Sequence, residues 1–194
     1  EYIGANVYKL KEEYIGKTQL PYKIEFFKVY DEYDDPDNLS EVEWRDKDLN
    51  LHRDDDKPAL IEFYMSQQLE KTVWYKNGLV HRDGDKPAWI DYTGGRNDNI
   101  SSQSWYKNGK IHRDGDKPAS IIYNNHGGVV KQMWYQNNKL NRDDREKPTV
   151  IFYNANGSHS IEQYHVNNKH YRTVRYDSYG DEISDEEEIS DEEF

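Results

Sequence analysis

Residues 74–88 read WYKNGLVHRDGDKPA, and residues 105–119 repeat them almost letter for letter as WYKNGKIHRDGDKPA. More diverged copies start at Trp44 and Trp134, and a fifth, weaker copy starts at Tyr164. The aromatic residues that open these copies are spaced by 30, 31, 29 and 30 residues. A repeat of this period predicts an array in which each copy buries its apolar face against its neighbours.

A proline, an isoleucine and an aromatic residue mark a second part of each copy. The isoleucine comes three residues after the proline, and the aromatic residue follows two positions later. The pairs are Ile61/Phe63, Ile90/Tyr92, Ile121/Tyr123 and Ile151/Tyr153. Residues two apart face the same side of a β-strand, so this segment is predicted to be extended. Pro21-Tyr22-Lys23-Ile24-Glu25-Phe26 fits the same frame, and the natural unit therefore begins at the proline.

The turns within each copy predict β-hairpins. Asn77-Gly78 and Asn108-Gly109 are typical of a two-residue type I′ turn, because both positions need a positive φ. Equivalent copies in one antiparallel sheet need an even number of main strands, so we expect two per repeat and a peripheral His-Arg segment. The predicted fold is all-β, an elongated tandem array of antiparallel β-hairpin repeats of about 30 residues with an acidic C-terminal tail.

Composition supports a core built on aromatic rings. Charged residues make up 33% of the chain, yet it contains 17 Tyr, 5 Phe and 5 Trp and no cysteine. A buried ring removes roughly 150–250 Å² from water, so regularly spaced rings can replace scarce aliphatic residues. The predicted structural core comprises the repeated Trp44, Trp74, Trp105 and Trp134 together with Ile61, Ile90, Ile121 and Ile151.

Acidity is concentrated at the C-terminus. The formal net charge is −12, and residues 181–194 hold nine acids and no Lys or Arg. We therefore divide the chain into an N-terminal cap segment (1–19), a repeat domain (20–176) and a low-complexity acidic tail (177–194) that is predicted to be disordered when free. The nearly balanced body offers no basic face for direct nucleic-acid binding, and no apolar run approaches the roughly 20 residues that span a bilayer.

The string His-Arg-Asp invites two chemical interpretations. In protein kinases the aspartate of such a string is a catalytic base. Here the string occurs three times, at residues 52–54, 81–83 and 112–114, whereas one enzyme needs one catalytic loop. A repeated structural turn, in which the arginine of one repeat pairs with an aspartate of its own or the next repeat, is the better interpretation. The recurring histidines likewise predict a surface ladder more strongly than a metal site, and we expect no catalytic residue, metal or cofactor.

The tyrosine after each tryptophan points to the opposite face of its strand and is the candidate protein-contact surface. These residues are Tyr75, Tyr106 and Tyr135. A platform for bases or sugars remains an alternative for such aromatic residues.

The acidic tail suggests a basic partner. Its candidate contacts are Asp185, Glu186, Glu187, Glu188, Asp191, Glu192 and Glu193. Ser184 and Ser190 each precede Asp-Glu-Glu, which is the context an acidophilic kinase recognises, and are candidate phosphorylation sites. A purely solubilising tail is the competing interpretation.

The WYKNG and HRDGDKPA strings resemble MORN and MORN-like repeats, and more narrowly the repeat arrays of large DNA viruses that infect amoebae, of the marseillevirus kind. They are also similar to bacterial aromatic-Asn-Gly-Lys repeats that are often described as antitoxin-like. The resemblance covers residues 20–172. It implies strings of β-hairpins in an elongated, often dimeric scaffold that associates with proteins or lipids. This chain departs from the common unit of about 23 residues by its longer, charged HRDGDKP insert, which argues against inherited lipid binding.

Two functional hypotheses follow. The first is a non-enzymatic scaffold of a large DNA virus that mediates protein–protein interaction and forms a homodimer. The second is an acidic-tail binder or chaperone of histones or other basic proteins. Either would act inside an infected host, in the cytoplasm, viral factory or nucleus, with the virion as a further location. An enzyme would need one polar cluster outside the repeat frame.

Overall fold

The structure is a computed structural model. It describes the backbone of residues 2–4, 7–14, 21–29, 39–94 and 99–187, and the side chains of residues 40–94 and 99–187. The described residues form strands, turns and bends without a helix, which confirms the all-β prediction. The chain divides into two compact units, Glu1–Ile100 and Ser101–Phe194.

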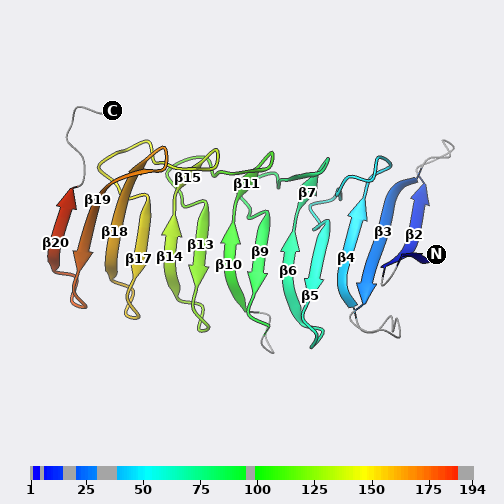
Figure 1. Ribbon diagram of the computed structural model, residues 1–194, viewed down its shortest axis with the longest axis horizontal. Helices are drawn as coiled ribbons and strands as arrows, with labels where there is room; N and C mark the ends of the chain where they lie inside the picture. The colour runs from blue at the N-terminus through cyan, green and yellow to red at the C-terminus, as the bar shows by residue number, and fades with distance from the viewer. Residues whose placement is uncertain (1, 5–6, 15–20, 30–38, 95–98, 188–194) are drawn as a thin grey trace. The chain divides into compact units, whose positions relative to one another are not determined.

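Unit 1 contains antiparallel strands that pair in chain order (Figure 1). They are β1 (Tyr2–Gly4), β2 (Val7–Tyr14), β3 (Pro21–Val29), β4 (Leu39–Arg45), β5 (Leu60–Phe63), β6 (Leu69–Val73) and β9 (Trp89–Tyr92). Strand β3 covers the early Pro–Ile–aromatic segment and pairs with β4, as β5 pairs with β6 in the next copy. The predicted cap segment supplies β1 and β2, and β2 pairs with β3.

Unit 2 follows the same plan. Its strands are β10 (Ile100–Ser104, which starts one residue before the unit), β13 (Ser120–Tyr123), β14 (Val129–Met133), β17 (Val150–Tyr153), β18 (His159–Val166), β19 (Lys169–Tyr176) and β20 (Glu182–Glu187). Each strand pairs antiparallel with the next. The isoleucine of a repeat lies opposite the residue two positions before the tryptophan of the preceding repeat; for example, Ile151 pairs with Gln132.

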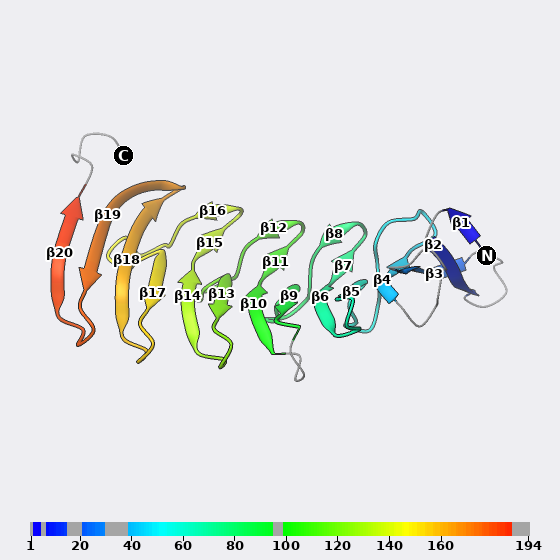
Figure 2. The same ribbon diagram turned by 60° about the horizontal axis from the view of Figure 1, so that its bottom comes forward.

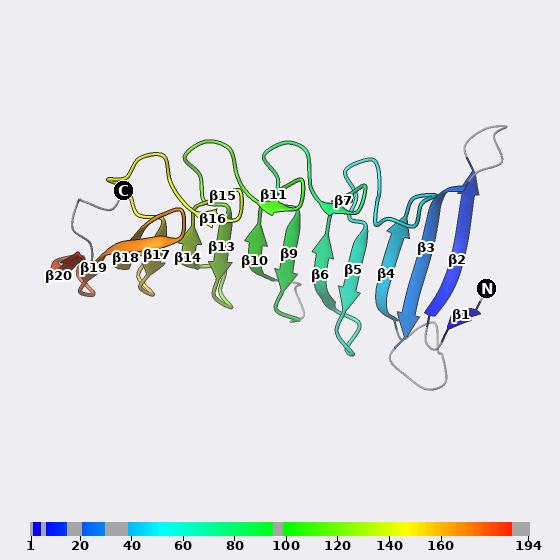
Figure 3. The same cartoon turned by 45° about the horizontal axis from the view of Figure 1, so that its top comes forward.

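Short two-stranded hairpins follow the tryptophans, outside the main pairing order (Figure 2). They are β7–β8 (Tyr75–Lys76 and Leu79–Val80) in unit 1, and β11–β12 (Tyr106–Lys107 and Lys110–Ile111) and β15–β16 (Tyr135–Gln136 and Lys139–Leu140) in unit 2. Asn77 and Gly78 have φ values of 51° and 77°, as a type I′ turn requires. Two main strands and a peripheral His-Arg segment per repeat are therefore confirmed. Within unit 2 the chain that leaves β11–β12 and β15–β16 loops back at the same end of the strands (Figure 3).

The core combines large rings with very small side chains. Trp44, Trp105 and Trp134 are each only 7% exposed, whereas Trp74 is half-buried. The alanine of each Lys-Pro-Ala segment is completely buried, and its carbonyl accepts a hydrogen bond from the tryptophan N–H, as in Trp74 N to Ala88 O at 2.8 Å. Among the isoleucines, Ile90 and Ile151 are buried while Ile61 and Ile121 are half-buried.

The C-terminal segment corrects one expectation. Residues 182–187 form strand β20 on the edge of β19, so the prediction of disorder is wrong for these six residues. A hairpin turn holds them there: the Asp177 carboxylate accepts from the N–H groups of Tyr179 and Asp181, and Gly180 adopts a φ of 93°. Residues 188–194 lie outside the described part of the chain.

Candidate interaction surface and inter-repeat clamps

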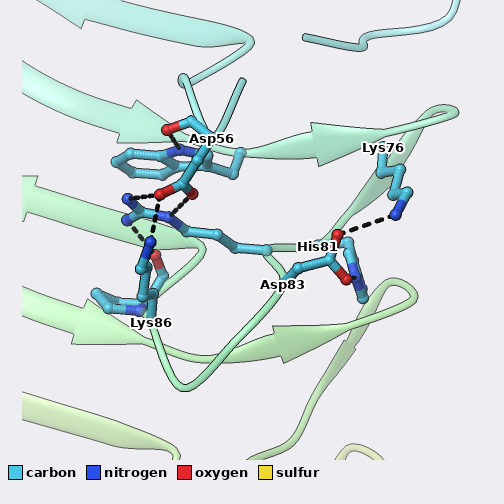
Figure 4. A network of polar contacts seen from close by, with 8 residues as sticks. Asp56, Lys76, His81, Asp83 and Lys86 are labelled. Atoms are coloured by element: carbon cyan, nitrogen blue, oxygen red, sulfur yellow. Dashed lines mark hydrogen bonds and ion pairs between the residues drawn. The ribbon is translucent and has the colours of Figure 1, made fainter. Parts of the chain in front are cut away.

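A clamp built around an arginine joins successive repeats in unit 1 (Figure 4). The Arg82 guanidinium lies 3.8 Å over the Trp74 ring and donates to the Pro87 carbonyl at 3.1 Å. It also donates through Nε and Nη2 to the Asp56 carboxylate, at 2.6 and 3.2 Å. Because Asp56 belongs to the previous repeat, the Arg–Asp pair spans 26 residues and ties two copies together. The sequence predicted an aspartate of the same or the next repeat as the partner, and that choice of partner is wrong.

Asp56 is the centre of this clamp. Its carboxylate also accepts from Lys86 Nζ at 2.6 Å, and its main-chain carbonyl accepts from Trp74 Nε1 at 3.1 Å. Hydrogen bonds from Arg82 and then Lys86 lower the pKa of the Asp56 carboxyl to about 2. Since 41% of the Asp56 side chain is exposed, water screens these charges and the clamp gives more specificity of register than stability.

Unit 2 contains the same clamp two copies further along. Arg142 lies 4.2 Å over the Trp134 ring, donates to the Pro148 carbonyl at 2.8 Å and pairs with Asp116. Lys147 Nζ donates to the same carboxylate at 2.8 Å. Hydrogen bonds from Arg142 and Lys147 again lower the Asp116 pKa to about 2. Two independent copies of one geometry show that HRDGDKP encodes a structural connection.

The repeated histidines accept hydrogen bonds from the next hairpin. His52 Nδ1 accepts from the Asn77 N–H at 3.0 Å, while its Nε2 lies 3.1 Å from the Asp54 carboxylate. His112 does the same towards Asn137 and Asp114, at 3.3 and 3.0 Å. An accepting Nδ1 carries no proton, so the Nε2–H tautomer of each ring donates to its aspartate.

An asparagine takes over this role in the fourth copy. Asn141 occupies the position of the histidine, and its Oδ1 accepts from the Asn167 N–H at 3.3 Å. The shared property is therefore a hydrogen-bond acceptor at this position. This substitution indicates a ladder that orders the hairpins, and it removes the reason to read the histidines as ligands. Among the described residues no group of three or more His, Asp or Glu side chains is placed to hold a metal ion.

A second ladder crosses the sheet and was not foreseen from the sequence. The tyrosine hydroxyl two residues after Ile90, Ile121, Ile151 or the corresponding Val174 meets a polar atom on the preceding main strand. The pairs are Tyr92–Thr72 (3.2 Å), Tyr123–Gln103 (2.8 Å), Tyr153–Gln132 (2.6 Å) and Tyr176–Glu162 (3.0 Å). In the first copy the equivalent residues are Phe63 and Val42, so hydroxyl and acceptor are lost together. That covariation inside one chain was a signal the sequence did contain.

The last member of this ladder is a buried carboxylate. Glu162 accepts from the Tyr164 and Tyr176 hydroxyls at 2.8 and 3.0 Å, and its other oxygen lies 2.6 Å from His159 Nδ1. Burial, followed by the bond to Glu162, raises the pKa of Tyr176 to about 12. Three partners satisfy a carboxylate that would otherwise be costly to bury, and they fix the C-terminal strands against one another.

The predicted contact tyrosines open the short hairpins. Tyr75, Tyr106 and Tyr135 are half-buried and pair across their hairpins with Val80, Ile111 and Leu140. Burial raises the pKa of the Tyr135 hydroxyl. Tyr75 lines a hollow of about 360 Å³ in unit 1 between the turns 52–56 and 81–86. Tyr135 lines a smaller hollow of about 110 Å³ at the matching place in unit 2.

The predicted basic-partner contacts are partly engaged within the chain. Asp185 accepts two hydrogen bonds from Arg172, and Glu186 accepts one from Arg175. Glu187 is exposed at the end of β20, and Ser184 lies directly opposite Arg175. Glu188, Ser190, Asp191, Glu192 and Glu193 lie outside the described residues. Two of the four acids of β20, Asp185 and Glu186, thus already have basic partners within the chain.

Comparison with known proteins adds no family assignment. The sequence matches no protein-family model, and a search of curated proteins found no significant relative. No helix in the described part of the chain is long and apolar enough to cross a membrane.

Proposed function

We propose that the protein is a non-enzymatic scaffold that binds a protein partner through its short hairpins. The observation that carries this proposal is the recurrence, in both units, of a hollow between successive His-Arg turns with a tyrosine in its wall. Clamps and backbone bonds such as Gly78 N–H to the Leu51 carbonyl at 2.9 Å hold these hollows in shape. A preformed, repeated surface lowers the ordering cost of binding.

The chemistry of the unit 1 hollow suits a partner that offers both apolar and basic groups. Trp74 and Tyr75 provide ring surface, and Asp54 and Asp83 provide carboxylates whose side chains are 71% and 76% exposed. Aromatic residues beside charged rims are typical of binding hot spots. Tyr106 occupies the matching position in hairpin β11–β12 of unit 2 and is proposed to contribute in the same way.

The finer assignment also belongs to this proposal. Repeated β-hairpins of about 30 residues support a MORN-like array, and the resemblance of the HRDGDKPA strings supports an origin in a large DNA virus. A homodimer and an intracellular site in the infected host follow from that resemblance. Localising a tagged chain in infected cells, with light scattering at several concentrations, tests both; a strictly monomeric mass would remove the homodimer.

The hairpin surface is tested with matched variants. Replacing Tyr75, Tyr106 and Tyr135 with serine should abolish capture of the partner that the wild-type chain retains. The control replaces Met65, His126 and Asn156 with serine, because these exposed residues lie in the turns between paired main strands. Circular dichroism checks that both variants keep their β structure. Retention of the same partner by the triple tyrosine variant would show that the proposed surface is wrong.

A further inference from the structure

The C-terminal strands pair a basic strand with an acidic one. Strand β19 carries Arg172 and Arg175, whereas β20 carries Glu182, Asp185, Glu186 and Glu187. The Arg172 guanidinium donates to the Asp185 carboxylate through Nε and Nη2 at 2.9 and 2.7 Å. Arg175 Nη1 donates to Glu186 at 2.7 Å. Neighbouring residues of a strand face opposite sides, so one ion pair lies on each face of the sheet.

Strand β20 contributes almost nothing to the core. Five of its six residues are exposed and Ser184 is half-buried; the one apolar side chain, Ile183, is 66% exposed. In the described part of the chain, the main-chain ladder and the ion pairs of Arg172 and Arg175 attach it to β19. Such partly exposed pairs contribute little to stability because water screens them, which makes the strand replaceable.

Arg172 is the clamp arginine of the fifth copy. It stands eight residues after Tyr164, as Arg142 stands eight after Trp134, and it lies 4.9 Å over the Tyr164 ring. In the internal clamps the carboxylate comes from the preceding repeat, but here it comes from β20. The edge of β19 thus presents an arginine that is already oriented by its stack on Tyr164 and that donates to a carboxylate of the strand added beside it.

We propose that the edge of β19 is an acceptor site for an extended acidic segment of a partner protein, with β20 as its built-in occupant and competitor. The matching segment carries two consecutive acids, as in Asp185-Glu186, so that one meets Arg172 and the next meets Arg175. Addition of a strand to a sheet edge supplies affinity through main-chain hydrogen bonds, and the two arginines supply selectivity. This site is separate from the hairpin surface.

The experiment uses the full chain with β20 loosened. Gly180→Val places a branched side chain at a φ of 93°, which strains the turn, and Asp185→Asn with Glu186→Gln removes the ion pairs. The probe is a fluorescent peptide with the sequence of residues 181–188, DEISDEEE. Because the attached strand has a high effective concentration, the loosened chain should bind this peptide about tenfold or more tightly than wild type.

Two controls isolate the ion pairs. A peptide with every acid changed to its amide should bind the loosened chain at least about tenfold more weakly than the acidic peptide does. Adding Arg172→Gln and Arg175→Gln to the loosened chain should lower its affinity for the acidic peptide by the same factor. The serine variants of Tyr75, Tyr106 and Tyr135 should bind the peptide as their parent does. Peptide binding at the β19 edge is thus measured independently of partner binding by the tyrosine hairpins, so that either proposal can fail without the other.

A measurement on the wild-type chain covers the case in which the loosened variant does not fold. Excess unlabelled acidic peptide should speed hydrogen exchange of the β20 amides, since it displaces that strand. Unchanged exchange, equal binding of the neutral peptide, or light scattering showing that a second copy fills the loosened edge would each overturn the proposal.

Discussion

The internal and terminal clamps of unit 2 place an arginine at the same repeat position but give it different partners. Arg142 stacks on Trp134 and pairs with Asp116, which Lys147 also binds. Arg172 stacks on the smaller ring of Tyr164 and pairs with Asp185 from the following strand. The arginine and a ring below it are constant, whereas the source of the carboxylate changes where the repeats end.

This difference shows how a repeat array can end without exposing an unpaired cation. An internal copy takes its acid from the turn of the preceding copy, where Asp116 stands three residues after Arg113. The turn before the last copy has Arg145 at that position, and Arg172 pairs with an acid of the following strand instead. The acidic segment after Gly180 supplies this carboxylate, from Asp185, as an edge strand. Charged residues on an edge strand also discourage uncontrolled pairing with other sheets.

The largest expected effect breaks the internal clamp at its ring. Trp134 is 7% exposed, so Trp134→Ala should lower the free energy of unfolding by about 3–5 kcal/mol through lost burial and the cavity left behind. Trp134→Phe is the control and should cost less, because most ring contact is kept. Urea denaturation measures both. A loss below about 1 kcal/mol for the alanine variant would contradict the core role of this ring.

The arginine itself comes next. Arg142→Ala removes the stack on Trp134, the bond to Pro148 and the pair with Asp116, and should cost about 1–3 kcal/mol. Arg142→Lys should recover little, because an ammonium lacks the planar fork that serves all three partners. Arg172→Ala should cost less than Arg142→Ala, since Arg172 holds an exposed edge strand. Equal costs in urea denaturation would remove the distinction between the two clamps.

The tyrosine ladder offers a finer comparison. Tyr153→Phe leaves the Gln132 side-chain oxygen without its 2.6 Å partner and should cost about 0.5–1.5 kcal/mol. Adding Gln132→Val reproduces the Phe63/Val42 combination of the first copy and should restore part of the loss. Tyr176→Phe should cost less, because Glu162 keeps Tyr164 and His159. A double-mutant cycle without coupling between Tyr153 and Gln132 would argue against the ladder.

The last comparison is a pH dependence of stability in two steps. Burial, and then the charge of His170, lower the pKa of His165 to about 4, so stability falls as pH drops from about 6.5 to about 4, where the unfolded chain binds the proton more readily. Asp116, with its pKa near 2, loses its contribution only between about pH 4 and pH 2. Unfolding curves at pH 7, 5 and 3 follow both steps. His165→Gln should remove the first step alone, and its persistence would assign that step to another group.

The pattern of the sequence predicted much of the fold because its signals are local. Asn77-Gly78 needs only its own backbone to specify a hairpin turn, and Ile90 with Tyr92 needs only the alternation of a strand. The buried alanine after each proline was missed because a single methyl group carries little hydrophobic signal. The strand at 182–187 was missed because its acids suggested a solvated tail, while the arginines that hold it lie on another strand.

By itself, the sequence determined the repeat length, the two main strands of each copy, the hairpins and the all-β class, since each depends on residues a few positions apart. Only the tertiary structure decided which charges and hydroxyls meet. Asp116 finds Arg142 across 26 residues, and Tyr153 finds Gln132 across 21. Those pairings follow from strand register, which brings distant positions within hydrogen-bond distance only after the sheet has formed.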